Sequence, residues 1–270
     1  MIDSLLEMFS YTFIQRAFIV GLFLSLCAAL VGVSLVLRKF SMIGDGLSHV
    51  AFGSVAIATI LGIAPIEFSI PIVIIVSFLI LKLNNSSRLS GDSLVAIISA
   101  SALAIGTFLI SINGVNIDIN SYLFGSILSL DSNDVIFSII LSLIVIILYI
   151  ISYNKIFAIT FDETFAKSIG INVDLYNIIF ASLCSIIVVL GMRLVGSLLI
   201  SSLLIFPTLT AINIFKKFKS TVIFSVIISI ISFSLGLIIS YFLASPTGAT
   251  IVIINLIVFI ISYVISIIKK

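Results

Sequence analysis

Gly44-Asp45-Gly46-Leu47-Ser48-His49 places the single histidine of the chain four residues after an aspartate, inside an apolar stretch long enough for a membrane-spanning helix. At this spacing the two side chains lie on one face of a helix. An aspartate at the centre of a span costs about 2.5 to 3.5 kcal/mol on insertion scales, so ionisable groups in spans usually mark a pathway or a binding site. The Asp45–His49 pair is therefore the first candidate for a functional site.

The composition of the whole chain is that of an integral membrane protein. Hydrophobic residues make up 61% of the 270 residues, charged residues make up 9%, and the mean hydropathy is +1.45. Soluble domains carry about a quarter charged residues. The net charge of +2 is too small to suggest a nucleic-acid partner. Cys27 and Cys184 lie in apolar runs and are expected to be buried as small hydrophobic side chains.

Nine apolar runs are each long enough to cross about 30 Å of hydrocarbon as a helix of roughly 20 residues. Strands are disfavoured because the runs lack the alternating pattern of a membrane barrel, and an isolated span can satisfy its own backbone only as a helix. We therefore expect an all-α bundle of about nine transmembrane helices, forming one domain over residues 1–270. The runs lie near residues 17–37, 42–62, 65–83, 92–112, 134–153, 173–191, 194–215, 221–243 and 247–268.

The basic residues favour one orientation of these spans. Eleven of the thirteen Lys and Arg residues fall on one side of a nine-span topology, and only Arg16 and Arg193 fall on the other. Because basic loops stay in the cytoplasm, we expect the N-terminus outside and the C-terminus in the cytoplasm. The segment Gly191-Met192-Arg193 is either a short external turn or a break in an irregular segment, so an eight-span or re-entrant arrangement is the alternative.

Two connections between the spans are longer than turns. The outer one contains residues 118–125 (DINSYLFG) and suits a membrane-surface loop or a short re-entrant helix. The inner one contains Phe161, Phe165 and Ile169, which are spaced to form one apolar stripe on a short helix. Asp162 can cap the start of this helix and Gly170 can end it. Such a helix fits lipid headgroups and a groove on a partner protein equally well.

The chemistry of the Asp45–His49 pair suits a divalent metal. A carboxylate oxygen and an imidazole nitrogen are usable ligands for zinc, manganese or ferrous iron. Two ligands are too few, but two copies of the chain meeting about a two-fold axis would supply four. Gly46 and Gly53 lie on a neighbouring face of the helix, where they would let another helix approach closely. That packing would turn the pair toward the interior of a bundle.

The pair is also compatible with a hydrogen-bonded contact that holds helices together, and with a proton relay. Hydrolytic catalysis is not expected, because the sequence has no second histidine, no cysteine pair and no serine nucleophile with a base. The sequence also has no Gly-Lys-Ser or Gly-Lys-Thr phosphate loop, so any ATP must be handled by a partner.

Four segments resemble, in order, the pattern of the zinc and manganese permeases of ATP-binding-cassette importers. Together with the matching spans, the resemblance covers most of the chain, from about Ala17 to Tyr263. The segments are residues 38–53 (RKFSMIGDGLSHVAFG), 121–125 (SYLFG), 161–170 (FDETFAKSIG) and 195–207 (VGSLLISSLLIFP). One departure is Thr208-Leu209-Thr210, where relatives often carry smaller residues, so we expect the packing there to differ.

The resemblance implies a homodimeric permease that works with two cytoplasmic ATPase subunits and an extracytoplasmic metal-binding protein in the membrane of a prokaryotic cell. It implies that Asp45 and His49 bind the metal in the translocation path, and that Pro207 joins Gly46 and Gly53 in helix packing. No permanently bound cofactor is expected, because the divalent ion, zinc or manganese with iron as a third candidate, is the cargo.

The resemblance also makes residues 155–171 the segment that docks in the ATPase. Its candidate coupling residues are Phe161, Asp162, Glu163, Phe165 and Gly170. Two rivals stand against this interpretation. A proton-driven secondary carrier would use Asp45 and His49 as its relay and need no ATP. A scaffold that transports nothing would use the pair only to stabilise a helix contact.

Overall fold

The computed structural model describes residues 7–86, 91–114, 125 and 131–268, and in these residues the chain is all-helical. The predicted outer segment at residues 118–124 lies outside them. The helices are α2 (Thr12–Leu37), α3 (Ile43–Leu61), α4 (Pro65–Ser86), α5 (Gly91–Asn113), α7 (Ser132–Phe161), α8 (Glu163–Ser168), α9 (Val173–Val195), α10 (Ser197–Ile214), α11 (Phe218–Leu243) and α12 (Thr247–Ile268).

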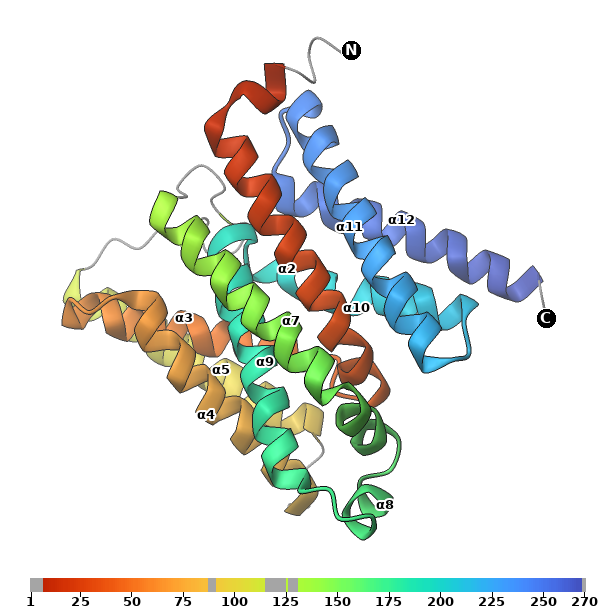
Figure 1. Ribbon diagram of the computed structural model, residues 1–270. Coiled ribbons are helices and arrows are strands. Elements are labelled where there is room, and N and C mark those ends of the chain that lie inside the picture. The colour runs from red at the N-terminus through yellow and green to blue at the C-terminus, as the bar shows by residue number, and fades with distance from the viewer. Residues whose placement is uncertain (1–6, 87–90, 115–124, 126–130, 269–270) are drawn as a thin grey trace.

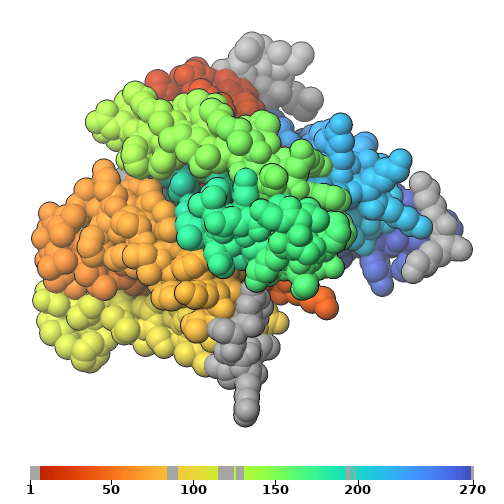
Figure 2. Space-filling model, turned by 60° about the horizontal axis from the view of Figure 1, so that its bottom comes forward, coloured from red at the N-terminus to blue at the C-terminus, as the bar shows by residue number. Residues whose placement is uncertain are grey.

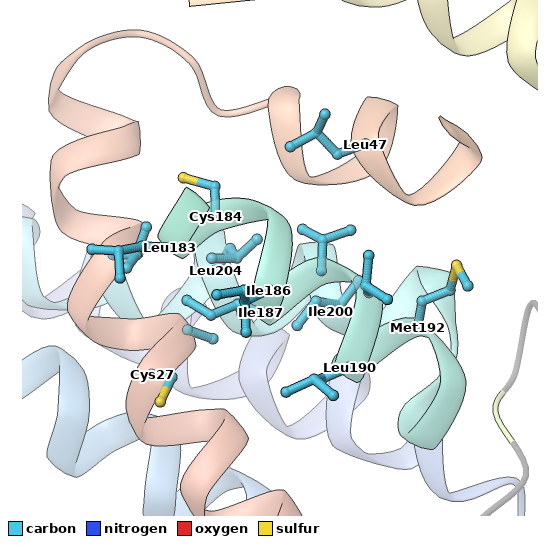
Figure 3. Close-up of a cluster of buried hydrophobic side chains, with 14 of the residues drawn as sticks. Cys27, Leu47, Leu183, Cys184, Ile186, Ile187, Leu190, Met192, Ile200 and Leu204 are labelled. Atoms are coloured by element: carbon cyan, nitrogen blue, oxygen red, sulfur yellow. The ribbon is translucent and has the colours of Figure 1, made fainter. Parts of the chain in front are cut away.

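The helices form three neighbouring groups (Figure 1). The helices α3, α4 and α5 lie together on one side, α11 and α12 lie on the other, and α2, α7, α9 and α10 lie between them. Helix α9 contacts α2, α3, α4, α7 and α10, so it occupies the middle of the bundle. Figure 3 shows buried side chains of this core, including Cys27, Leu47, Cys184 and Leu204. Both cysteines are buried, as expected.

Eight helices in the described part of the chain are long and apolar enough to cross a membrane. They correspond to eight of the nine predicted runs. The remaining run forms α10, which has 18 residues and whose apolar part, Leu199–Ile214, is shorter than the other eight helices. The count of nine spans therefore stays a prediction.

Helix α7 is longer than the predicted run at residues 134–153. Its 30 residues span about 45 Å, whereas the hydrocarbon core is about 30 Å thick. The predicted run ends before the polar residues Asn154 and Lys155, but the helix continues through the buried side chains of Ile156 and Ile159 and ends at Phe161. Burial against neighbouring elements overrides the polar pair, and the last turns of α7 exceed the length that a span requires.

The boundary between α9 and α10 lies at Gly196, and the predicted boundary at residues 191–193 is wrong. Gly191 and Met192 are helical and buried in the structure. Gly196 has φ 91° and ψ 159°, a conformation that a residue without a Cβ adopts at little cost. Gly191 lies inside α9, where an added Cβ would overlap the Ile200 side chain of α10.

Helix α10 buries polar residues beside its internal proline. Pro207 is buried and lacks the N–H that would bond to the carbonyl of Leu203. The Thr208 hydroxyl lies 3.3 Å from the Ser225 hydroxyl of α11, and the Thr210 hydroxyl donates to the Phe206 carbonyl oxygen at 2.7 Å. Thr208 and Thr210 are thus accommodated by local and interhelical hydrogen bonds.

Helix α3 packs against α5 through glycines on both helices. A Cβ on Gly53 would lie 2.8 Å from the Ala102 carbonyl oxygen, and a Cβ on Gly46 would overlap the Val95 side chain. On α5, a Cβ on Gly106 would lie 3.0 Å from the Gly53 Cα atom. The two backbones therefore approach more closely than larger residues would allow, which is how small residues promote helix packing in lipid.

We expect Gly53→Val to destabilise the protein by about 1 to 3 kcal/mol, because the added carbons must push α5 away from α3. The measurement is denaturant unfolding of the purified chain in detergent. The control is Thr59→Val, which changes an exposed side chain on the same helix. Equal stability of both variants and the unmodified protein would contradict the packing described for Gly53.

Candidate functional site

The Asp45–His49 pair lies in the first two turns of α3. Helix α2 ends at Leu37, and α3 begins at Ile43. Asp45 belongs to the first helical turn of α3. The positive end of the helix dipole stabilises a carboxylate there. This location lowers the cost of the charge, because Asp45 lies near one end of the span and not at its centre.

The two side chains come together without forming a hydrogen bond. The His49 Nε2 atom lies 3.8 Å from Asp45 Oδ2, beyond the usual hydrogen-bond distance. The side chain of His49 is 20% exposed and that of Asp45 is 40% exposed. Both ligand atoms belong to one helix, so their contact does not join two helices. The geometry leaves the pair accessible to a small ion.

The spacing of the donor atoms is compatible with one metal ion. Two donors that each bind zinc at about 2.0 to 2.2 Å can lie at most about 4.4 Å apart, and the pair lies 3.8 Å apart. The other imidazole nitrogen, Nδ1, is buried and has no hydrogen-bond partner among the described residues. No hydrogen bond to that nitrogen fixes the orientation of the ring.

One chain supplies only part of a metal site. Among the described residues, no group of three or more His, Cys, Asp or Glu side chains comes together. Asp45 and His49 therefore act as a pair in the single chain. A metal held by four ligands would need donors from elsewhere, such as a second copy or water.

Close helix packing holds the pair in place. Gly46 and Gly53 face α5, and a Cβ on Gly44 would lie 2.7 Å from the Leu204 side chain of α10. Ser48 of the same helix is buried, and its hydroxyl donates to the Asp45 carbonyl oxygen at 2.7 Å. With α3 fixed on two sides, Asp45 and His49 are the accessible polar groups of its first two turns.

The predicted short helix in the inner connection is α8. The Asp162 carboxylate accepts a hydrogen bond from the Phe165 N–H at 2.9 Å, so it caps the start of the helix as predicted. At the other end Gly170 has φ +84°, and its N–H and that of Ile171 donate to the carbonyls of Lys167 and Ala166. These two bonds are those of a Schellman ending, in which glycine is favoured.

The apolar stripe of this segment is divided between two helices. Phe161 is the last residue of α7 and not the first of α8, because the backbone turns at Asp162 with φ −152°. The side chains of Phe161, Phe165 and Ile169 are 62%, 56% and 55% exposed. Figure 2 looks toward this end of the molecule and shows the green surface of α7 and α8 near the middle of the face. The segment therefore presents three large apolar side chains at the surface.

Sequence reasoning missed the glycines that complete the packing around the pair. Gly44 touches Leu204, and Gly106 of α5 faces Gly53 and Phe52. A further close approach joins α2 and α10, where a Cβ on Gly32 would overlap the backbone of Leu204. The available signal was the presence of glycine inside apolar helical runs, which often marks close backbone contact in membranes. The partners of these glycines are distant in sequence and could not be read from it.

A helical membrane bundle with an accessible carboxylate–imidazole pair in one span is typical of a transport permease. The chain belongs to the ABC 3 transport family, whose model matches residues 10–266. The family resemblance inferred from the four sequence segments is thus confirmed.

Individual relatives agree with the family match. The chain is 32% identical to the high-affinity zinc uptake system membrane protein ZnuB of Haemophilus influenzae, over 91% of this chain and 95% of that protein. It is 30% identical to the manganese import system permease protein ScaB of Streptococcus gordonii, over 95% and 92% of the two chains. Its fold matches a chain of PsaBC from Streptococcus pneumoniae in complex with Fab, with a TM-score of 0.87, 29% identity, and coverage of 97% and 95%.

We expect Asp45→Asn and His49→Gln each to weaken zinc binding by the purified chain at least tenfold, about 1.4 kcal/mol, because the first removes the negative charge of the carboxylate and the second removes the imidazole nitrogen. The measurement is equilibrium dialysis with radioactive zinc. Glu67→Gln is the matched control, since it neutralises an exposed carboxylate in the first turn of α4. Unchanged zinc binding in both variants would contradict the metal role, and loss of folded protein in both would favour a structural role for the pair.

Proposed function

We propose that this chain is the permease subunit of an ATP-binding-cassette importer for a divalent metal ion, zinc or manganese, with iron as a third candidate. The observation that carries the proposal is the accessible Asp45–His49 pair in α3, held by close packing in a chain of the ABC 3 transport family. ATP hydrolysis is supplied by a separate ATPase subunit, and an extracytoplasmic binding protein delivers the ion. The whole chain, residues 1–270, acts as one permease domain.

A homodimer would complete the metal site. Each chain contributes one carboxylate and one imidazole, and two chains related by a two-fold axis contribute four ligands. The exposed fractions of Asp45 and His49 leave room for the second copy to approach. The names of ZnuB and ScaB describe a zinc uptake protein and a manganese import permease, which supports zinc and manganese as cargo.

The orientation that we propose places α8 in the cytoplasm and the N-terminus outside. In Figure 1 the N-terminal end and α8 lie at opposite ends of the bundle. The basic residues Lys155, Lys167 and Lys216 belong to the proposed cytoplasmic side. Helix α10, with 18 residues and a length of about 27 Å, is close to the thickness of the hydrocarbon core and serves as the ninth span. The membrane is the cell membrane of a prokaryote.

The segment at the end of α7 and in α8 is the docking site for the ATPase in this proposal. Its exposed apolar side chains are available to a groove on a partner, and the capped ends of α8 keep the short helix formed. The end of α7 beyond the length of a span lets this segment stand away from the lipid. ATP binding moves the ATPase subunits, which push the two copies of α8 and switch the bundle between outward-open and inward-open states.

Transport sets a limit on how tightly the ion can bind. A site that conducts must bind the ion well enough to receive it and weakly enough to release it. Two donors from each chain, exposed on one side of α3, agree with a transient site. No step requires chemical change of the ion, so the permease itself performs no catalysis in this proposal.

We expect ATP-dependent uptake of radioactive zinc or manganese by vesicles that contain this chain, its ATPase and its binding protein, and we expect His49→Ala to reduce that uptake at least tenfold. The physical reason is the loss of one ligand from each half of the site. Uptake that continues without ATP would favour a proton-driven carrier. Absence of metal uptake in the unmodified complex would favour a scaffold.

We expect Phe165→Glu to weaken binding of the ATPase at least tenfold, because it places a charge in the apolar docking stripe. The measurement is co-purification and titration of the ATPase against the detergent-solubilised chain. Thr164→Glu is the control, because it adds the same charge at an exposed neighbouring position of α8. Equal affinity of both variants and the unmodified chain would remove α8 from the docking site.

A further inference from the structure

The turn between α2 and α3 is tightly built. Lys39 has φ +63°, and its N–H donates to the Val36 carbonyl at 3.0 Å, while the Phe40 N–H donates to the Leu35 carbonyl at 2.9 Å. These bonds close the end of α2 around Arg38, and the Ile43 N–H donates to the Phe40 carbonyl at 3.0 Å as α3 begins. Because these hydrogen bonds fix the turn, a displacement of Arg38 would also displace the start of α3.

The Arg38 side chain crosses from this turn to the central helix α9. Its Nη1 atom donates to Asn177 Oδ1 at 3.1 Å, and its Cζ atom lies 5.0 Å from the centre of the Phe180 ring. A planar guanidinium can donate a hydrogen bond and stack on an aromatic ring at the same time, which an ammonium group cannot do as well. Arg38 thus contacts two residues of α9, Asn177 and Phe180, which lie about one helical turn apart on the same face.

A pocket of about 280 Å³ separates Arg38 from α8. Arg38, Asn177 and Glu163 line it, and Glu163 is the first residue of α8. The remaining lining residues come from the α2–α3 turn, α4 and the end of α7: Leu37, Lys39, Phe40, Leu81, Ile159, Thr160 and Phe161. The pocket leaves α8 room to move relative to the α2–α3 turn. Arg38 and Glu163, which carry opposite charges, both line it.

Charge links Glu163 to Arg38 across this pocket. Burial lowers the pKa of the Arg38 guanidinium, and the negative charge of Glu163 acts in the opposite direction. Glu163 also lies 3.5 Å from Lys167, one turn further along α8. The Glu163 carboxylate therefore lies between a cation on its own helix and a cation on the α2–α3 turn.

We propose that Arg38 is a positioning residue that transmits movement of α8 to the metal pair of α3. When α8 moves, Glu163 shifts relative to Arg38, and Arg38 carries the change through the α2–α3 turn to Asp45 in the first turn of α3. The contacts with Asn177 and Phe180 give this movement a fixed support on α9. The inference rests on the proposed function, since it requires that α8 receives the force of ATP hydrolysis.

The test is the number of metal ions transported per ATP hydrolysed by the complete complex in vesicles. We expect Arg38→Gln to lower this ratio at least fivefold while ATP hydrolysis and ATPase binding persist, and Arg38→Lys to restore part of it. Lys39→Gln is the matched control, because it neutralises the neighbouring exposed cation of the same turn, and it is expected to stay within twofold of the unmodified complex. A residue that served only stability would lower the yield of complex and not the ratio.

A double-variant comparison tests whether Arg38 acts through Glu163. Glu163→Gln alone should lower the ratio several-fold, and combining it with Arg38→Gln should lower the ratio no further, because both changes break one link. An unchanged ratio in Arg38→Gln, or losses that multiply in the double variant, would overturn the proposal. If Arg38→Gln fails to fold, Glu163→Gln at the edge of the pocket decides the question, and an unchanged ratio there overturns the proposal.

The unmodified complex separates this inference from the proposed function. If it moves no metal on addition of ATP, the importer proposal fails and the role of Arg38 falls with it. If it moves metal on ATP and the Arg38 variants keep the normal ratio, only the role of Arg38 fails.

Discussion

The requirement that every backbone N–H and C=O be satisfied inside lipid governs the rest of this structure. It makes each span a helix. Because lipid tails are as apolar as the side chains, burial of hydrophobic surface cannot by itself hold these helices together, and close packing must do so. The contact of α3 with α5 through Gly46, Gly53 and Gly106 is the clearest case. That contact also covers one face of α3, while Asp45 and His49 stay partly exposed.

Hydrogen bonds between polar side chains join particular pairs of helices. Asn255 of α12 donates to Ser202 of α10, and Asn213 of α10 donates to Ser262 of α12, each at 3.3 Å. Between α11 and α2, the Ser229 hydroxyl donates to a backbone carbonyl of α2 at 2.9 Å. Such bonds contribute about 0.6 to 2 kcal/mol each in membranes. They join α2, α10, α11 and α12 by specific partners, whereas α3 is held mainly by the close approach of glycines.

The charged residues to which we assign roles in transport lie at the ends of helices. Asp45 lies in the first turn of α3, Arg38 caps the end of α2, and Glu163 begins α8. Charges at these positions cost less than charges at the centre of the bilayer, because the helix dipole favours an anion at the start of a helix and a cation at its end. The same positions are where a helix can move without breaking internal hydrogen bonds. The charged residues that we assign to transport thus lie where the fold can hold a charge at least cost.

The sequence alone determined the features that depend on local periodicity and local hydrogen bonds. The helical class, eight helices long and apolar enough to span, the common face of Asp45 and His49, the cap at Asp162 and the glycine ending at Gly170 were predicted correctly, since each depends on local sequence. Only the tertiary structure decided that α7 runs on to Phe161, that the α9–α10 break lies at Gly196, and that Arg38 meets Asn177. The physical reason is that burial and packing against other helices outweigh local preference, and contacts such as that of Arg38 with Asn177, 139 positions away, are encoded in no local pattern.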